Sequence, residues 1–229
     1  MTTLPVSLTH NEKILGWSFW GLQQLVLPAA ISLLVPAFAP GMNTATRNFL
    51  YLAVSFLMIT AVMLRFLRQS LRVFIQRPFY ALRWAFIPYL VYWVSYLSIR
   101  FLLATFVPTF RNINDATIFQ LLQENAALTS IGVILLAPIA EELFYRGVIF
   151  GTFHPHNRLA AYALSCIAFS AVHLAGYMHQ ADGLTLVLCF VQYLPAGLCL
   201  AWSYDRSGTI WAPILMHIAI NQTGILSWR

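Results

Sequence analysis

The chain has 229 residues, of which 60% are hydrophobic and only 9% charged, and its mean hydropathy is +0.73. Soluble domains carry about a quarter charged residues, so this composition excludes a water-soluble globular domain and indicates a protein surrounded by a lipid bilayer. The net charge is +6. The arginines flank apolar runs instead of forming one basic face, which argues against nucleic acid as a partner.

Apolar runs of about 20 residues are long enough to cross a membrane as helices. The sequence therefore predicts an all-α, polytopic transmembrane bundle of about seven spans, within a range of six to eight. The arginine-rich stretch near 67–83 is predicted to lie on the membrane surface, and 108–127 is predicted to be an external loop with a short amphipathic helix. The seven predicted spans are 14–38, 49–66, 84–107, 128–150, 158–177, 184–204 and 209–228.

The distribution of basic residues predicts the orientation of the bundle. Four arginines lie between the second and third spans and Arg65 lies at the end of the second, which places that side in the cytoplasm by the positive-inside rule. We therefore expect a cytoplasmic N-terminus in a bacterial plasma membrane, and no cleavable signal peptide. The three cysteines lie in apolar segments without metal-ligand spacing and are expected to be buried thiols; they are Cys166, Cys189 and Cys199.

Two neighbouring carboxyl groups lie inside the fourth predicted span, in the run LLAPIAEELFYRGVIF. Ionisable groups at this depth are costly, which makes them candidates for function. Glu142 lies four residues before Arg146, on the same helical face, so these two can neutralise each other. Glu141 points elsewhere and lies over Tyr145, which cannot neutralise it. We interpret Glu141 as the chemically available carboxylate, although a purely structural Glu–Arg pair is an alternative for Glu142.

The fifth and seventh predicted spans carry further polar groups. His173 lies four residues after Phe169, and His217 lies four residues before Asn221, so each pair shares a helical face. Hydrogen bonding between helices is the simpler explanation of each pair alone. Together with Glu141, however, they would provide a carboxylate and a histidine to deprotonate water, and two donors for an oxyanion. This combination predicts peptide-bond hydrolysis.

These residues resemble the three motifs of the CPBP family, the CAAX proteases and bacteriocin-processing enzymes also called Abi proteins. The first motif matches Glu141, Glu142 and Arg146, the second Phe169 and His173, and the third His217 and Asn221. The resemblance covers roughly 128–226, so we expect a family-type protease core of four helices at 128–229. Residues 1–127 are expected to form N-terminal transmembrane helices and loops.

The resemblance implies a membrane endopeptidase of the glutamic type that works without a cofactor. Glu141 and His173 would activate the water, and His217 with Asn221 would form the oxyanion site, supported by Glu142 and Arg146. The substrate would be a peptide or protein at the membrane, of the CAAX or bacteriocin-related type. The family also includes members linked to bacteriocin immunity, some of them without proteolysis.

Three alternatives remain open on the sequence. A zinc metalloprotease could use Glu141, His173 and His217 as ligands, but the chain has no HExxH helix and Asn221 would lack a role. A non-catalytic immunity or scaffold protein could keep the same polar groups as contacts between helices. A transporter could use Glu141 in a proton relay, although no inverted repeat supports this.

Overall fold

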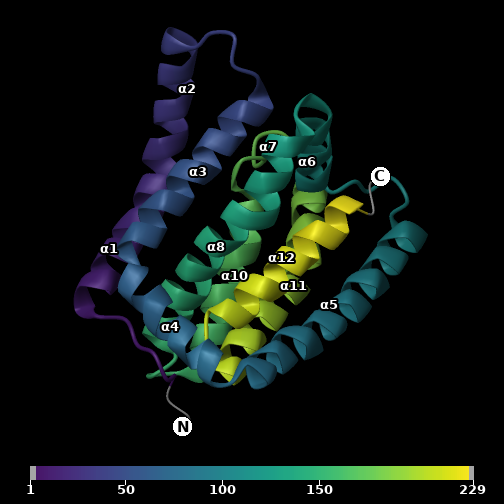
Figure 1. Cartoon of the computed structure of the whole chain (residues 1–229). Coiled ribbons are helices and arrows are strands. Elements are labelled where there is room, and N and C mark those ends of the chain that lie inside the picture. The colour runs from purple at the N-terminus through teal and green to yellow at the C-terminus, as the bar shows by residue number, and fades with distance from the viewer. Residues whose placement is uncertain (1–3, 227–229) are drawn as a thin grey trace.

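The computed structural model describes residues 4–226, and within that range the chain is helical, with no β-strand (Figure 1). Six helices are long and apolar enough to cross a membrane: His10–Phe38, Thr44–Val62, Pro78–Phe106, Ala126–Phe153, Arg158–Ala175 and Gly183–Ser207. The predicted all-α, polytopic bundle is therefore confirmed, and the chain is an integral membrane protein.

All seven predicted spans are helical in the structure. The first comprises α1 (His10–Gly21), the π-helical turn η1 (Leu22–Val26) and α2 (Leu27–Phe38). The second is α3 (Thr44–Val62), the third α5 (Pro78–Phe106), the fifth α10 (Arg158–Ala175) and the sixth α11 (Gly183–Ser207). The seventh, α12 (Trp211–Leu226), has 16 residues and is shorter than a full span. Residues 227–228 of the predicted seventh span, and Arg229, lie outside the described residues.

The fourth span is the centre of the bundle. It comprises α7 (Ala126–Ile131), the π-helical segment η2 (Gly132–Leu136), α8 (Ala137–Glu142), the π-helical segment η3 (Leu143–Phe150) and α9 (Gly151–Phe153). Every residue of η3 is buried, and helices α1, α3, α10, α11 and α12 all pack against this span. A helix enclosed in this way can carry polar groups that lipid would not tolerate.

Two shorter helices mark the two ends of the bundle. Helix α4 (Leu64–Gln76) occupies the predicted surface stretch; it buries Phe66 and Leu67 and exposes Arg68 and Arg72. Helix α6 (Ile113–Glu124) occupies the predicted external loop at the opposite end (Figure 1).

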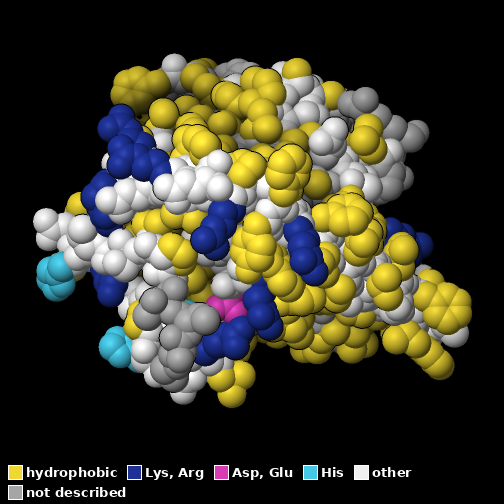
Figure 2. Space-filling model, turned by 60° about the horizontal axis from the view of Figure 1, so that its bottom comes forward, with side chains coloured by type: hydrophobic (Ala, Val, Ile, Leu, Met, Phe, Trp, Pro, Cys, Tyr) yellow, Lys and Arg dark blue, Asp and Glu magenta, His cyan; other side chains and the backbone are white. Residues whose placement is uncertain are grey.

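Large apolar side chains cover much of the outer surface, as a lipid-facing bundle requires. Lysine and arginine side chains gather instead at the α4 end, which faces the reader in Figure 2. The three predicted buried thiols are confirmed: Cys166, Cys189 and Cys199 are free and buried.

Candidate active site

A fully buried ion pair lies at the middle of the fourth span. Arg146 Nη1 donates to Glu142 Oε1 at 3.0 Å, and both side chains are 0% exposed. Arg146 also donates from Nη2 to the carbonyl oxygen of Gly197 at 3.0 Å, and its guanidinium lies 4.6 Å from the centre of the Phe169 ring. Glu142 ends α8 and Arg146 lies four positions later in η3. This is the pairing that the sequence predicted from their spacing.

Glu142 has a second partner that the sequence did not predict. His217 Nδ1 lies 2.8 Å from Glu142 Oε1, the oxygen that also accepts from Arg146. A carboxylate that receives an Arg hydrogen bond acts as acceptor, so His217 Nδ1 donates. Glu142 therefore orients the His217 ring and turns its Nε2 toward Glu141, whose Oε2 is 3.9 Å away.

Asn221 is anchored to the fourth span by a bond that depends on proline. Its Nδ2 donates to the carbonyl oxygen of Val133 at 2.8 Å. In η2 the Ala137 N–H donates to the Gly132 carbonyl instead of the Val133 carbonyl, so residue 138 is the next candidate donor for Val133. Residue 138 is proline and has no N–H. Asn221 replaces the missing donor, and its second amide hydrogen is not used by this bond.

Glu141 is a carboxylate without a hydrogen-bond partner among residues 4–226. Its side chain is 23% exposed, and its Oε2 is buried without a hydrogen bond to the described part of the chain. Arg146 is committed to Glu142, and no other arginine of the described chain forms an ion pair with Glu141. The role of Glu141 as the chemically available carboxylate remains a prediction.

One hydrogen bond to a backbone carbonyl and contacts with two aromatic rings position the His173 side chain. Its Nδ1 lies 2.8 Å from the carbonyl oxygen of Phe169. A carbonyl can only accept, so Nδ1 carries the proton and the neutral ring has its lone pair on Nε2. The ring lies 4.7 Å from Phe169 and stacks on Tyr193 at 4.3 Å, centre to centre. Phe169 also packs against the His217 ring at 5.6 Å.

One cavity of about 240 Å³ brings the predicted residues together: Glu141, His173, His217 and Asn221 all line it. Glu142 and Arg146 lie behind it, in the buried pair. The sequence analysis missed a polar wall contributed by α6 and α11. There Asn114 Nδ2 donates to the Tyr193 hydroxyl at 2.9 Å, and that hydroxyl lies 3.4 Å from Asp115 Oδ1. Burial raises the pKa of Asp115 to about 6.

The zinc alternative requires three ligands around one point. Among residues 4–226, no group of three His, Cys, Asp or Glu side chains is placed to hold a metal ion. Within the described residues, the zinc alternative is therefore not supported by a set of three ligands.

The C-terminal half of the chain resembles a family model of CAAX endopeptidases and a protein named as a putative membrane peptidase. Residues 123–223 match the family model "Type II CAAX prenyl endopeptidase Rce1-like". A Bacillus subtilis (strain 168) protein named "Putative membrane peptidase YdiL" is 33% identical over 88 residues, which are 38% of this chain. The match spans about a third (32%) of the length of that relative. No solved structure matches.

These findings confirm the resemblance to the CPBP family over the region that carries the three motifs. The matched residues 123–223 include all six predicted site residues, from Glu141 to Asn221. They also include η2 and Pro138, which position Asn221, and Tyr193, which stacks on His173.

Proposed function

We propose that this protein is an intramembrane endopeptidase of the glutamic type, which hydrolyses a peptide bond in the cavity next to Glu141. The observation that carries the proposal is a carboxylate that has no hydrogen-bond partner and no arginine counter-ion among residues 4–226, in a cavity that two histidines also line. A charge in this position is costly in a membrane protein, and catalysis is a reason to keep it there.

Glu141 and His173 activate the water in this proposal. His173 Nε2 has its lone pair available because Nδ1 donates to Phe169. The water oxygen attacks the carbonyl carbon of the substrate, and its proton passes to Glu141 or to His173 Nε2. The carbonyl oxygen becomes an oxyanion. When the C–N bond breaks, the proton passes to the leaving amine, and the products are a carboxyl group and an amine.

His217 and Asn221 stabilise the oxyanion in this proposal. Asn221 offers the amide hydrogen that Val133 does not use. His217 donates to the oxyanion from Nε2. Its Nδ1 already donates to Glu142, so the ring carries a proton on both nitrogens and is an imidazolium. That positive charge, with Arg146, balances the two carboxylates Glu141 and Glu142. Glu142 therefore has a positioning role, because it holds His217 and Arg146 together.

The proposed substrate is a peptide or protein at the membrane, of the CAAX type or related to bacteriocins. The description of the matched family names CAAX prenyl endopeptidases, which supports the first class for this chain. A non-catalytic scaffold or immunity protein is the second candidate. It is favoured by the bonds from His217 to Glu142 and from Asn221 to Val133, which any contact between helices could use.

The decisive comparison is between membranes of cells that carry the wild-type protein and cells that carry Glu141→Gln. Peptides and new protein termini that depend on Glu141 would be identified by proteomics. We expect Glu141→Gln and His173→Ala each to abolish these products while the protein remains folded. Glu124→Gln is a matched control, because Glu124 accepts a hydrogen bond from Ala45 N in α3, outside the cavity. Retention of the products by purified Glu141→Gln would rule out the catalytic assignment.

A further inference from the structure

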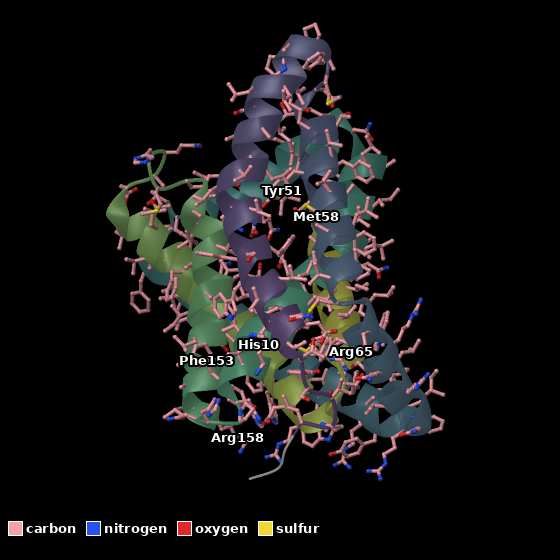
Figure 3. The ribbon with its side chains drawn as sticks, turned by 90° about the vertical axis from the view of Figure 1, so that its left-hand side faces the viewer. His10, Tyr51, Met58, Arg65, Phe153 and Arg158 are labelled. Atoms are coloured by element: carbon pink, nitrogen blue, oxygen red, sulfur yellow. The ribbon has the colours of Figure 1, made fainter. Side chains whose placement is uncertain are left out.

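Some arginines at the α4 end of the bundle are neutralised by acidic side chains. Figure 3 shows Arg65 and Arg158 at this end, beside the start of α1 and the end of α9. Arg65 donates from Nε to Glu12 Oε1 at 3.1 Å, and Arg158 donates from Nε to Asp205 Oδ2 at 3.0 Å. The charges of these two arginines are therefore balanced within the protein.

Two other arginines at this end have no acidic partner. Arg83 and Arg206 are exposed, and neither forms an ion pair with an acidic side chain among residues 4–226. Asp205 precedes Arg206 in the chain, but its two carboxylate oxygens bind three other side chains: His154, Arg158 and Tyr162. Arg83 and Arg206 thus present positive charge that the protein leaves unbalanced.

These two arginines come together on one tryptophan between two membrane helices. Arg83 lies near the start of α5 and Arg206 at the end of α11, and the two helices pack against each other. The guanidinium carbon atoms of Arg83 and Arg206 lie 5.8 Å and 5.5 Å from the centre of the Trp84 ring. Trp202 packs edge-on against Trp84 at 5.8 Å. Tryptophan favours the level of the lipid headgroups, so this cluster has the depth of a headgroup site.

An exposed apolar stripe continues from each of the two arginines along its helix. On α5, Phe86 and Leu90 follow Arg83 at three and seven positions, and both are exposed. On α11, Leu198 lies eight positions before Arg206 and is also exposed. Residues at these spacings share a helical face. A cation above an apolar stripe, on two neighbouring helices, is complementary to an anionic headgroup that carries acyl chains.

We propose that Arg83, Arg206 and Trp84 form a binding site for an anionic phospholipid. The lipid phosphate lies against the two guanidinium groups, which are well suited to bind phosphate oxygens, and the acyl chains lie along the apolar stripes of α5 and α11. Basic pockets between membrane helices bind anionic headgroups in this way. The proposal goes beyond the proposed function and does not depend on proteolysis.

The site can be tested by native mass spectrometry of the purified protein, titrated with phosphatidylglycerol and with phosphatidylcholine of the same acyl chains. The test variant combines Arg83→Gln with Arg206→Gln. The matched control combines Arg68→Gln with Arg72→Gln, which removes the same charge from exposed positions of α4. Neither control residue lies over an aromatic ring in the part of the chain that the structure describes.

We expect the wild type to bind phosphatidylglycerol about tenfold more tightly than phosphatidylcholine, because two unbalanced cations face its phosphate. The Arg83→Gln, Arg206→Gln variant should lose most of this preference, each single variant should lose a smaller share, and the control should keep it. Equal losses in the two double variants would reduce the effect to general surface charge and would overturn the proposal. The proposal would also fail if the wild type bound the two lipids equally.

Discussion

Glu142 Oε1 accepts two hydrogen bonds at once, from His217 Nδ1 at 2.8 Å and from Arg146 Nη1 at 3.0 Å. One buried carboxylate oxygen thus joins the fourth span to α12, and through Arg146 Nη2 and the Gly197 carbonyl to α11. The residue beside it, Glu141, is left for other partners. Neighbouring glutamates therefore divide two tasks: Glu142 holds the bundle and the His217 ring, and Glu141 faces the cavity.

Removal of Glu142 should cost stability as well as activity. Glu142→Ala leaves Arg146 buried and unpaired, which typically costs about 3–5 kcal/mol. Glu141→Gln should lower the melting temperature less, because Glu141 Oε2 makes no hydrogen bond within the described chain and lies 3.9 Å from His217 Nε2. Thermal unfolding in detergent compares the two variants. Equal melting temperatures for both would show that Glu142 does not hold the bundle.

The sequence was sufficient for relationships that depend on helix periodicity. It predicted that Glu142 would pair with Arg146, because residues four apart share a helical face. It also predicted every membrane helix, because apolar length is a strong signal. It could not predict the bond from Glu142 to His217, because the two residues are 75 positions apart and no local pattern specifies how α12 rotates against the fourth span.

The convergence of His217 and Asn221 was predicted from their spacing, and the structure shows a different arrangement of their bonds. His217 binds Glu142, and Asn221 binds Val133. The second bond depends on Pro138 within a π-helical register, and an ideal α-helix drawn on the sequence does not contain that register. The role of the two residues toward an oxyanion remains a prediction.

The structural role of Asn221 can be separated from any catalytic role by a double-mutant cycle with Pro138. Asn221→Leu should destabilise the fold by roughly 1–3 kcal/mol, because the Val133 carbonyl loses its donor. In a Pro138→Ala background the backbone N–H of residue 138 can bind that carbonyl, so Asn221→Leu should cost less. Melting temperatures of the four proteins measure the coupling. If the losses of stability from Pro138→Ala and Asn221→Leu are additive, Asn221 does not replace a missing backbone donor.

Tyr193 should position His173 through its ring and not through its hydroxyl. The two rings stack at 4.3 Å, and Tyr193→Phe keeps this contact while it loses the bond from Asn114. We expect Tyr193→Phe to retain most of the wild-type rate and Tyr193→Ala to lower kcat by about tenfold or more, since a misplaced base transfers protons less efficiently. Product formation by purified variants measures this. A loss of rate in Tyr193→Phe as large as that in Tyr193→Ala would assign the role to the hydroxyl.

Gly197 should tolerate no side chain, because α10 and α11 approach each other closely there. A Cβ at this position would lie 2.8 Å from Cys166 Sγ and 3.2 Å from Cys166 Cα. Gly197→Ala should therefore push the helices apart, at a cost of about 1–3 kcal/mol, and draw the Gly197 carbonyl away from Arg146. Gly176→Ala, with nothing within 4 Å of its Cβ, is the matched control. Equal melting temperatures for the two variants would contradict the close approach.

Asp115 should make the fold less stable as the pH rises. Burial raises the pKa of its carboxyl from 3.8 to about 6, against opposing effects of Tyr193 and Arg100. The folded state therefore binds more protons than the unfolded state between these values, so this group's contribution is fully present below pH 4 and is lost as the pH rises through about 6. The loss is on the order of 2–3 kcal/mol. Asp115→Asn cannot ionise, so its melting temperature should exceed that of the wild type at pH 8 and approach it at pH 4. A wild-type advantage at pH 8 would mean that the ionised Asp115 is stabilised by Arg100 more than burial opposes it.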